Sequence, residues 1–303
     1  MAKNEKVDVK NITNEVVKQT GEVLASATNK VKRGFSDSQS KVINIIDQNG
    51  NGEIDIEDII ILGLKTPGVR INRTEFLNRE FRKHYSEDVI EKAINETPAL
   101  AGISSDLIDK ISNDVIQSER NLVSGISTAL GSPGGFAMVA TIPTDIIQYY
   151  GYLLRAMQKI LYLYGFPEIN TEMNDTYFDS ETMNTLVLCM GVMYGAAGAS
   201  NALKGIAHAL GQGVEKKLLR TALTKGTFYP VVKSTLKWFN VNLTKKIFAN
   251  FFKKSIPVIG GLVGGGITYL TFKPCCDKLK DTVKDTILSN PNYEKLNDFE
   301  SLF

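Results

Sequence analysis

The chain has 303 residues, of which 43% are apolar and 22% are charged, and its formal net charge is +2. This composition is close to the average of globular proteins, so a wholly disordered chain and an ordinary polytopic membrane protein are excluded. Three cysteines cannot build a disulfide framework, and two histidines leave little room for a histidine-based metal site or catalytic triad.

The N-terminal sequence MAKNEKVDVKNITNEVVKQ contains charges but no apolar stretch. It therefore predicts no secretory signal, and the free cysteines fit a reducing compartment. We expect a cytoplasmic protein, or one held peripherally on the inner face of a membrane.

Charge is distributed unevenly along the sequence. Residues 204–273 contain 12 Lys or Arg and a single acid, Glu215, whereas residues 1–203 carry a net −7 and residues 274–303 a net −2. Such a basic stretch attracts an anionic surface, either lipid headgroups or nucleic acid. The alternative is that its lysines lie on solvated helix faces beside the acidic N-terminal part.

The hydrophobic pattern predicts helices almost everywhere, because no run of alternating β-branched residues is bounded by hairpin turns. We expect an all-α fold, a multi-helix domain with buried glycine-rich central helices, preceded by a small helix–loop–helix. The expected division is an arm or helix at 1–35, the helix–loop–helix at 36–66, a connecting helix at 67–94, the main helical domain at 95–285 and a tail at 286–303. Amphipathic helices are expected over 72–96 and 104–130, the first entered at Asn72.

The segment Asp47-Gln-Asn-Gly-Asn-Gly-Glu-Ile-Asp-Ile-Glu-Asp58 resembles an EF-hand loop. A hard dication needs six or more oxygen ligands, and such a loop presents them from alternate positions and from its end. The predicted ligands are Asp47, Asn49, Asn51, the backbone carbonyl of Glu53, Asp55 and Asp58. Position 12 is Asp instead of the usual Glu, which weakens Ca²⁺ binding and makes Mg²⁺ a better competitor. The alternative is a polar turn that holds no ion.

Three spans carry no charged side chain, namely 121–144, 182–203 and 255–272. Their lengths approach that of a membrane-spanning helix, but glycines and prolines interrupt them. Small residues let two helices approach closely, either within a protein core or within a membrane. Both interpretations stay open: central core helices, or segments that contact a membrane.

A long helix is predicted to start near Thr141 or Thr144 and to end at Gly165. Along it a stripe of polar side chains recurs at steps of three and four and so shares one face: Asp145, Gln148, Tyr152, Arg155 and Lys159. This stripe either faces solvent or faces inward. In the second case Asp145 and Arg155 need partners on neighbouring helices, because an unpaired buried charge is very costly. An inward stripe would mark a polar network or a site, and an enzyme of unknown reaction that uses Asp145 and Arg155 is an alternative function.

Parts of this region resemble the EcsC family of bacterial proteins over about residues 95–285. The residues that carry the resemblance are the Gly131–Gly135 turn, the Ile142-Pro-Thr-Asp145 helix start, Arg155, Tyr164-Gly165 and the late run Ile256–Gly261 with Gly264 and Gly265. The resemblance implies an α-helical, membrane-associated domain and no particular reaction.

The sequence contains no Rossmann, Walker A or zinc-protease motif. The leading hypothesis is therefore a non-enzymatic, membrane-associated helical protein that is regulated by its Ca²⁺ loop. Ion binding would free a set of lysines for anionic lipid: Lys216, Lys217, Lys245, Lys246, Lys253 and Lys254. A non-specific nucleic-acid binder acting through residues 204–273 ranks last. That region has one arginine, Arg220, and one tryptophan, Trp238, whereas base recognition uses arginine and stacked aromatics.

Overall fold

A computed structural model describes residues 47–130, 138–169, 180–241 and 260–290. Within these ranges the chain forms ten helices and no strand, which confirms the all-α prediction. The helices are α2 (Ile56–Lys65), α3 (Arg73–Phe81), α4 (Glu87–Asn95), α5 (Ser105–Leu130), α6 (Met138–Leu163), α7 (Ser180–Tyr194), α8 (Ala199–Gly211), α9 (Lys216–Thr224), α10 (Tyr229–Phe239) and α12 (Gly260–Lys284). The predicted arm at 1–35 and the helix expected to enter the ion loop lie outside the described residues.

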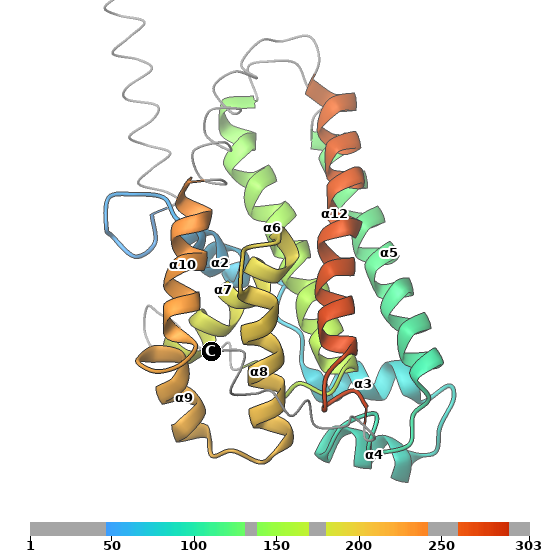
Figure 1. Ribbon diagram of the computed structural model, residues 1–303. Coiled ribbons are helices and arrows are strands. Elements are labelled where there is room, and N and C mark those ends of the chain that lie inside the picture. Colours follow the sequence, from blue (N-terminus) through green and yellow to red (C-terminus); the bar gives the residue numbers. More distant parts are fainter. Residues whose placement is uncertain (1–46, 131–137, 170–179, 242–259, 291–303) are drawn as a thin grey trace, which may run out of the picture.

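Three long helices, α5, α6 and α12, run side by side (Figure 1). A second group, α8, α9 and α10, packs around α7, which also contacts α2 and α12. Helices α3 and α4 cross the lower end of the molecule, and α2 lies against α6 and α7. None of the described helices is both long enough and apolar enough to cross a bilayer.

Helix α7 is the centre of the second group, and it contains most of the uncharged span 182–203. Every residue from Met183 to Met193 is buried except Thr185. A Cβ added to Gly191 would lie 2.6 Å from Cγ2 of Thr235 and 3.0 Å from Cβ of Ala199. Glycine at this position therefore lets α10 and α8 approach α7 closely, and the part of the span that lies in α7 is core.

The boundaries of α6 follow the prediction at one end only. The helix ends at Leu163, and Gly165 follows with φ 89°, as the sequence indicated. The helix begins at Met138, earlier than the predicted caps Thr141 and Thr144, so Pro143 lies within it. Its tyrosines are mainly core residues, since Tyr150, Tyr162 and Tyr164 are all buried.

The stretch 72–96 differs from the single helix expected. Asn72 is the predicted N-cap of α3, and its side chain accepts a hydrogen bond from Glu75 N. The chain leaves the helix after Phe81 and starts α4 after Ser86. A turn here lets both short helices bury their apolar faces, whereas one straight helix would leave one of those faces in solvent.

Candidate metal loop and the polar network around it

The loop that precedes α2 is built around the carboxylate of Asp47. One Asp47 oxygen accepts from Gly50 N at 2.7 Å and from Asn51 N at 3.2 Å, and the other accepts from Gly52 N at 2.8 Å. Gly50 and Gly52 have φ values of 71° and 80°, in the left-handed region that favours glycine. The first predicted ligand therefore shapes the turn itself.

Two more predicted ligands, Asn49 and Asn51, form hydrogen bonds to one oxygen of a third, Asp55. The amide nitrogens of Asn49 and Asn51 both donate to Asp55 Oδ2, at 3.2 and 3.1 Å. Their amide oxygens accept from Asn51 N at 3.0 Å and from Glu53 N at 2.8 Å. A cation at this meeting point would replace the two hydrogen bonds to Asp55, and both amides would have to turn so that their oxygens face it, because an amide N–H group does not bind a cation.

Asp58, the last predicted ligand, closes the loop onto the start of α2. It is fully buried, and its Oδ1 accepts from Gln48 N at 2.7 Å and from Asn49 N at 3.1 Å. Its Oδ2 accepts from Asp55 N at 3.0 Å, while Asp55 Oδ1 accepts from Asp58 N at 3.1 Å, which forms a capping box on α2. Burial raises the pKa of Asp58, and hydrogen bonds from the backbone oppose that rise. The hydrogen bonds of Asp58 therefore hold the loop against the start of α2.

The predicted metal ligands of this loop are of three kinds: carboxylates, side-chain amides and one backbone carbonyl. Within the described residues no group of three or more His, Cys, Asp or Glu side chains is placed to hold a metal ion. The loop would have to add the amides of Asn49 and Asn51 and the carbonyl of Glu53 to its carboxylates. All of these offer oxygen, the donor that Ca²⁺ and Mg²⁺ prefer, so the residue types suit a hard dication.

Helix α2 packs closely against α6. A Cβ on Gly63 would lie 2.7 Å from Cδ1 of Leu154 and 3.6 Å from Cα of Gly151, so the two backbones approach closely. The turn after α2 is then bound by two α6 side chains, as Arg155 donates to the carbonyl of Gly68 and Gln158 Nε2 donates to Val69 O at 2.9 Å. The loop 47–58 therefore leads directly into a helix that packs against α6.

The polar stripe of α6 faces inward at its lower part. Glu119 of α5, with a side chain 1% exposed, pairs with Arg155 Nε at 3.0 Å and with Lys159 Nζ at 2.5 Å. The prediction that the stripe faces solvent is therefore wrong for Arg155 and Lys159. The side chain of Asp145 lies outside the described residues.

Sequence reasoning missed Glu119, although a signal was present. Glu119 follows Val115 and Ile116 at four and three residues and precedes Val123 by four, so it belongs to the apolar stripe of α5. A lone acid on such a stripe needs a buried partner. Both its oxygens bind cations, an arrangement that holds α5 to α6.

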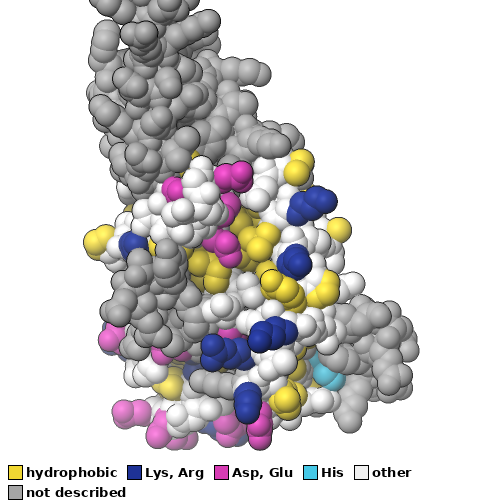
Figure 2. Space-filling view, turned by 90° about the vertical axis from the view of Figure 1, so that its left-hand side faces the viewer, with side chains coloured by type: hydrophobic (Ala, Val, Ile, Leu, Met, Phe, Trp, Pro, Cys, Tyr) yellow, Lys and Arg dark blue, Asp and Glu magenta, His cyan; other side chains and the backbone are white. Residues whose placement is uncertain are grey.

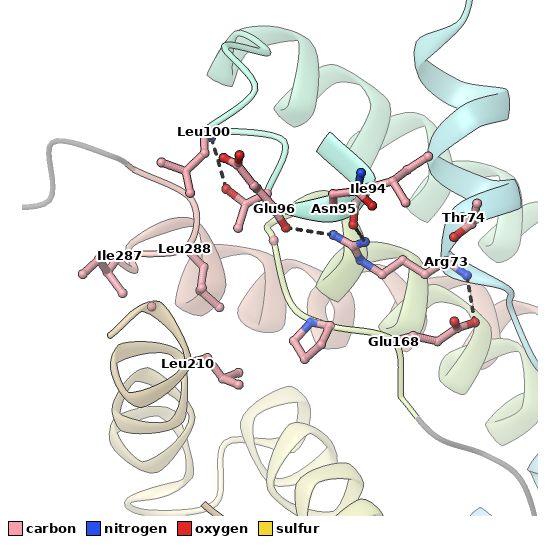
Figure 3. A pocket seen from close by; sticks show the side chains of 14 residues that line it. Arg73, Thr74, Ile94, Asn95, Glu96, Leu100, Glu168, Leu210, Ile287 and Leu288 are labelled. Carbon is pink, nitrogen blue, oxygen red and sulfur yellow. Dashed lines mark hydrogen bonds between the residues drawn. The ribbon is translucent and has the colours of Figure 1, made fainter. Parts of the chain in front are cut away.

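A pocket of about 660 Å³ lies at the lower end, where α3, the end of α4 and the ends of α6, α8 and α12 meet (Figure 3). Its most buried charge is Arg73, which is 6% exposed. The guanidinium donates to Phe166 O at 3.0 Å, Ile94 O at 2.5 Å and Ala93 O at 3.3 Å. Burial lowers the pKa of Arg73. Arg73 caps the C-terminus of α4, and its donors are used for structure.

The cysteines are buried and free. Burial raises the pKa of Cys189 to about 12 and that of Cys275 to about 11. These thiols are protonated at neutral pH and are core side chains.

The described part of the basic stretch lies mainly on α9 and α10. Residues 216–241 carry six Lys or Arg and no acid. The exposed members are Lys217, Arg220, Lys225, Lys233 and Lys237. Figure 2, which views this side of the molecule, shows Lys and Arg side chains spread over the face with apolar side chains between them. Lysines 245, 246, 253 and 254 lie outside the described residues.

No family model, no curated protein and no solved structure matches this chain. The resemblance to the EcsC family therefore stays a prediction.

Proposed function

We propose that this is a non-enzymatic helical protein that binds one Ca²⁺ ion in the loop 47–58 and associates with an anionic membrane surface. The observation that carries the ion-binding part is the folding of Asn49, Asn51 and Asp55 onto one point, inside a turn shaped by Asp47. The EF-hand spacing of the sequence and the structure of the loop support the same residues.

An ion in this loop would also relieve an unfavourable concentration of acids at the start of α2. Burial, and then the charges of Asp55 and Asp58, raise the pKa of Glu57. A dication nearby offsets that repulsion and strengthens the attachment of the loop to α2. Because α2 is bound to α6, the ion would act on the orientation of α2 within the bundle.

Calorimetric titration of the full chain with Ca²⁺, with Mg²⁺ in the buffer, tests the ion site. We expect a Kd at or weaker than the sensor range of about 10⁻⁷–10⁻⁵ M, because position 12 is Asp. Asp47→Ala and Asp55→Ala should abolish the heat of binding. Glu53→Gln is the matched control, since only the backbone carbonyl of this residue is a predicted ligand. Heat that persists in Asp47→Ala, or no heat in the natural chain, would reduce the loop to a polar turn.

The membrane part is supported by the exposed lysines and arginine of α9 and α10, whose sequence from 216 to 241 contains no acid. About 1 kcal/mol of attraction per Lys or Arg is typical near an anionic leaflet. Flotation with phosphatidylcholine vesicles, with and without phosphatidylglycerol, should show binding only with the anionic lipid and less binding at high salt. Equal binding to both vesicle types would contradict it.

The enzyme alternative needs charged groups that are free to react. Arg155 is held by Glu119 and by the carbonyl of Gly68, so the stripe gives that alternative no support. The nucleic-acid alternative would use the same basic face, and a mobility shift that survives moderate salt would favour it over the membrane.

A further inference from the structure

The segment 216–241, which contains α9 and α10, exposes cations that no acid pairs with. The exposed cations are Lys217, Arg220, Lys225, Lys233 and Lys237. Among the residues that the structure describes, none of these five forms an ion pair. By contrast, Lys204 of α8 pairs with Asp285, and Lys273 of α12 pairs with Asp277, both at 2.6 Å. The cations of α9 and α10 are therefore available to an external anion.

Two apolar side chains are exposed among these cations. Leu218 of α9, which directly follows Lys217, is 60% exposed, and Val241, after the C-cap of α10, is 54% exposed. On α10, Lys233, Lys237 and Val241 recur at steps of four and so share one side of the helix. An exposed leucine gains free energy when it enters an apolar phase. Cations and apolar side chains are thus presented together.

The packing of α9 fixes the outward direction of Leu218. Leu219 and Leu223 are 6% and 0% exposed, so they form the inner side of α9, which packs against α7 and α10. The Asn184 amide of α7 donates to Leu223 O at 3.1 Å, at a buried position near the end of α9. Because these contacts set the rotation of the helix about its axis, Leu218 points away from the core.

Helices α9 and α10 lie on one side of the molecule, α10 above α9 in Figure 1. Figure 2, which faces this side, shows Lys and Arg side chains with apolar side chains between them. We use the name α9–α10 surface for the exposed residues Lys217, Leu218, Arg220, Lys225, Lys233, Lys237 and Val241.

The chemistry of the α9–α10 surface matches an anionic lipid bilayer. Lysines and arginine bind negative headgroups, and an apolar side chain between them reaches the acyl boundary beneath. A nucleic acid offers phosphates to the cations but no apolar layer to Leu218. Base recognition also relies on arginine and stacked aromatics, whereas this surface has one arginine, Arg220.

We propose that the α9–α10 surface rests on an anionic bilayer, with its cations at the headgroups and Leu218 in the acyl boundary. This inference rests on the proposed membrane association and names the side chains that make the contact.

The cations are tested by flotation of the full chain with vesicles of phosphatidylcholine and phosphatidylglycerol at several salt concentrations. Each cation lost near such a surface lowers binding about fivefold, so Lys233→Gln/Lys237→Gln should lower the partition coefficient about 25-fold at low salt and less at high salt. The matched control is Lys83→Gln/Lys92→Gln, which removes the same charge from exposed positions beside α3 and on α4. It should bind within about twofold of the natural chain, since its lysines lie away from the surface.

The apolar contact is tested separately with Leu218→Ser, which changes no charge. The variant should lower the partition coefficient about tenfold at low and at high salt, because one leucine no longer enters an apolar phase. Leu100→Ser is the matched control, since Leu100 is 51% exposed and lines the pocket at the lower end. It should bind like the natural chain, and circular dichroism should show that all variants keep their helices.

Three results would overturn the inference, and they differ in meaning. If the natural chain binds and all variants bind equally well, the membrane association stands and the α9–α10 surface does not make it. If only Leu218→Ser binds like the natural chain, the leucine does not enter the bilayer and the proposed contact is wrong. If the natural chain does not bind anionic vesicles, or binds only nucleic acid, both the association and this contact are wrong.

Discussion

The lower half of α5, α6 and α12 differs in charge from the upper end of the same three helices, residues 121–130, 138–147 and 260–270, which we call the tip. In the lower half, Glu119 binds Arg155 and Lys159, and Asp109 of α5 binds Lys284 of α12. The tip has one charged residue in its sequence, Asp145. Ion pairs in one half can fix the relative positions of long, stiff helices along their whole length. The other half then needs no charged contact to hold it.

The strongest test of this comparison is Glu119→Ala. The variant leaves Arg155 and Lys159 without their carboxylate at a buried position, and we expect a loss of about 3–5 kcal/mol in the free energy of unfolding. Urea denaturation measures it. Glu80→Ala is the control, since its pair with Arg79, at 2.8 Å, is at the surface and should cost at most about 1 kcal/mol. A small effect for Glu119 would mean that the lower half is not held by this network.

A second test addresses the turn that ends α6 in the lower half. At Gly165, φ is 89°, and an added Cβ would lie 2.8 Å from the carbonyl oxygen of Leu288. Gly165→Ala should therefore lower the free energy of unfolding by about 2–4 kcal/mol, from backbone strain and overpacking together.

Gly102→Ala is the matched comparison for this position. Gly102 has φ 84° but nothing within 4 Å of an added Cβ, so only the backbone strain of about 1–2 kcal/mol applies. Equal losses in the two variants would show that the packing at Gly165 contributes nothing.

A third prediction concerns the ion loop, which reaches the lower half through α2. A ligand at one hundred times its Kd stabilises the folded state by about 2.7 kcal/mol. Saturating Ca²⁺ should therefore raise the thermal midpoint of the natural chain and of Glu53→Gln, but not that of Asp55→Ala. A rise in Asp55→Ala as well would place the ion elsewhere.

The smallest effect is expected at Asp109. Burial acts to raise the pKa of this carboxyl, but hydrogen bonds from Lys284 and Tyr164 outweigh it and lower the pKa below its usual value. A lowered folded-state pKa means that the carboxylate stabilises the fold above its ordinary pKa, and that this contribution is lost as the pH falls through the folded-state pKa. Asp109→Asn should cost at most about 1 kcal/mol near neutral pH. The difference from the natural chain should shrink below about pH 4, where urea denaturation at several pH values would detect it. A difference that does not change with pH would contradict this assignment.

Local features of the fold could be predicted from the sequence. Asn72 caps α3 and Gly165 ends α6, as their positions indicated. Each depends on interactions within a few residues. The candidate ion ligands could be named for the same reason, because they belong to one loop. The resemblance to EcsC, the membrane association and the ion itself stay predictions.

Only the tertiary structure decided which surfaces meet. The sequence could not choose the orientation of the α6 stripe, because that choice depends on Glu119, which is 36 residues from Arg155. Nor could the sequence show that the three uncharged spans take different places in the fold. Most of one lies in the buried helix α7, while the described parts of the other two lie in α5, α6 and α12. An uncharged helix satisfies its own backbone hydrogen bonds and is compatible with a core or with an apolar surface. Its place is therefore set by which helices pack around it.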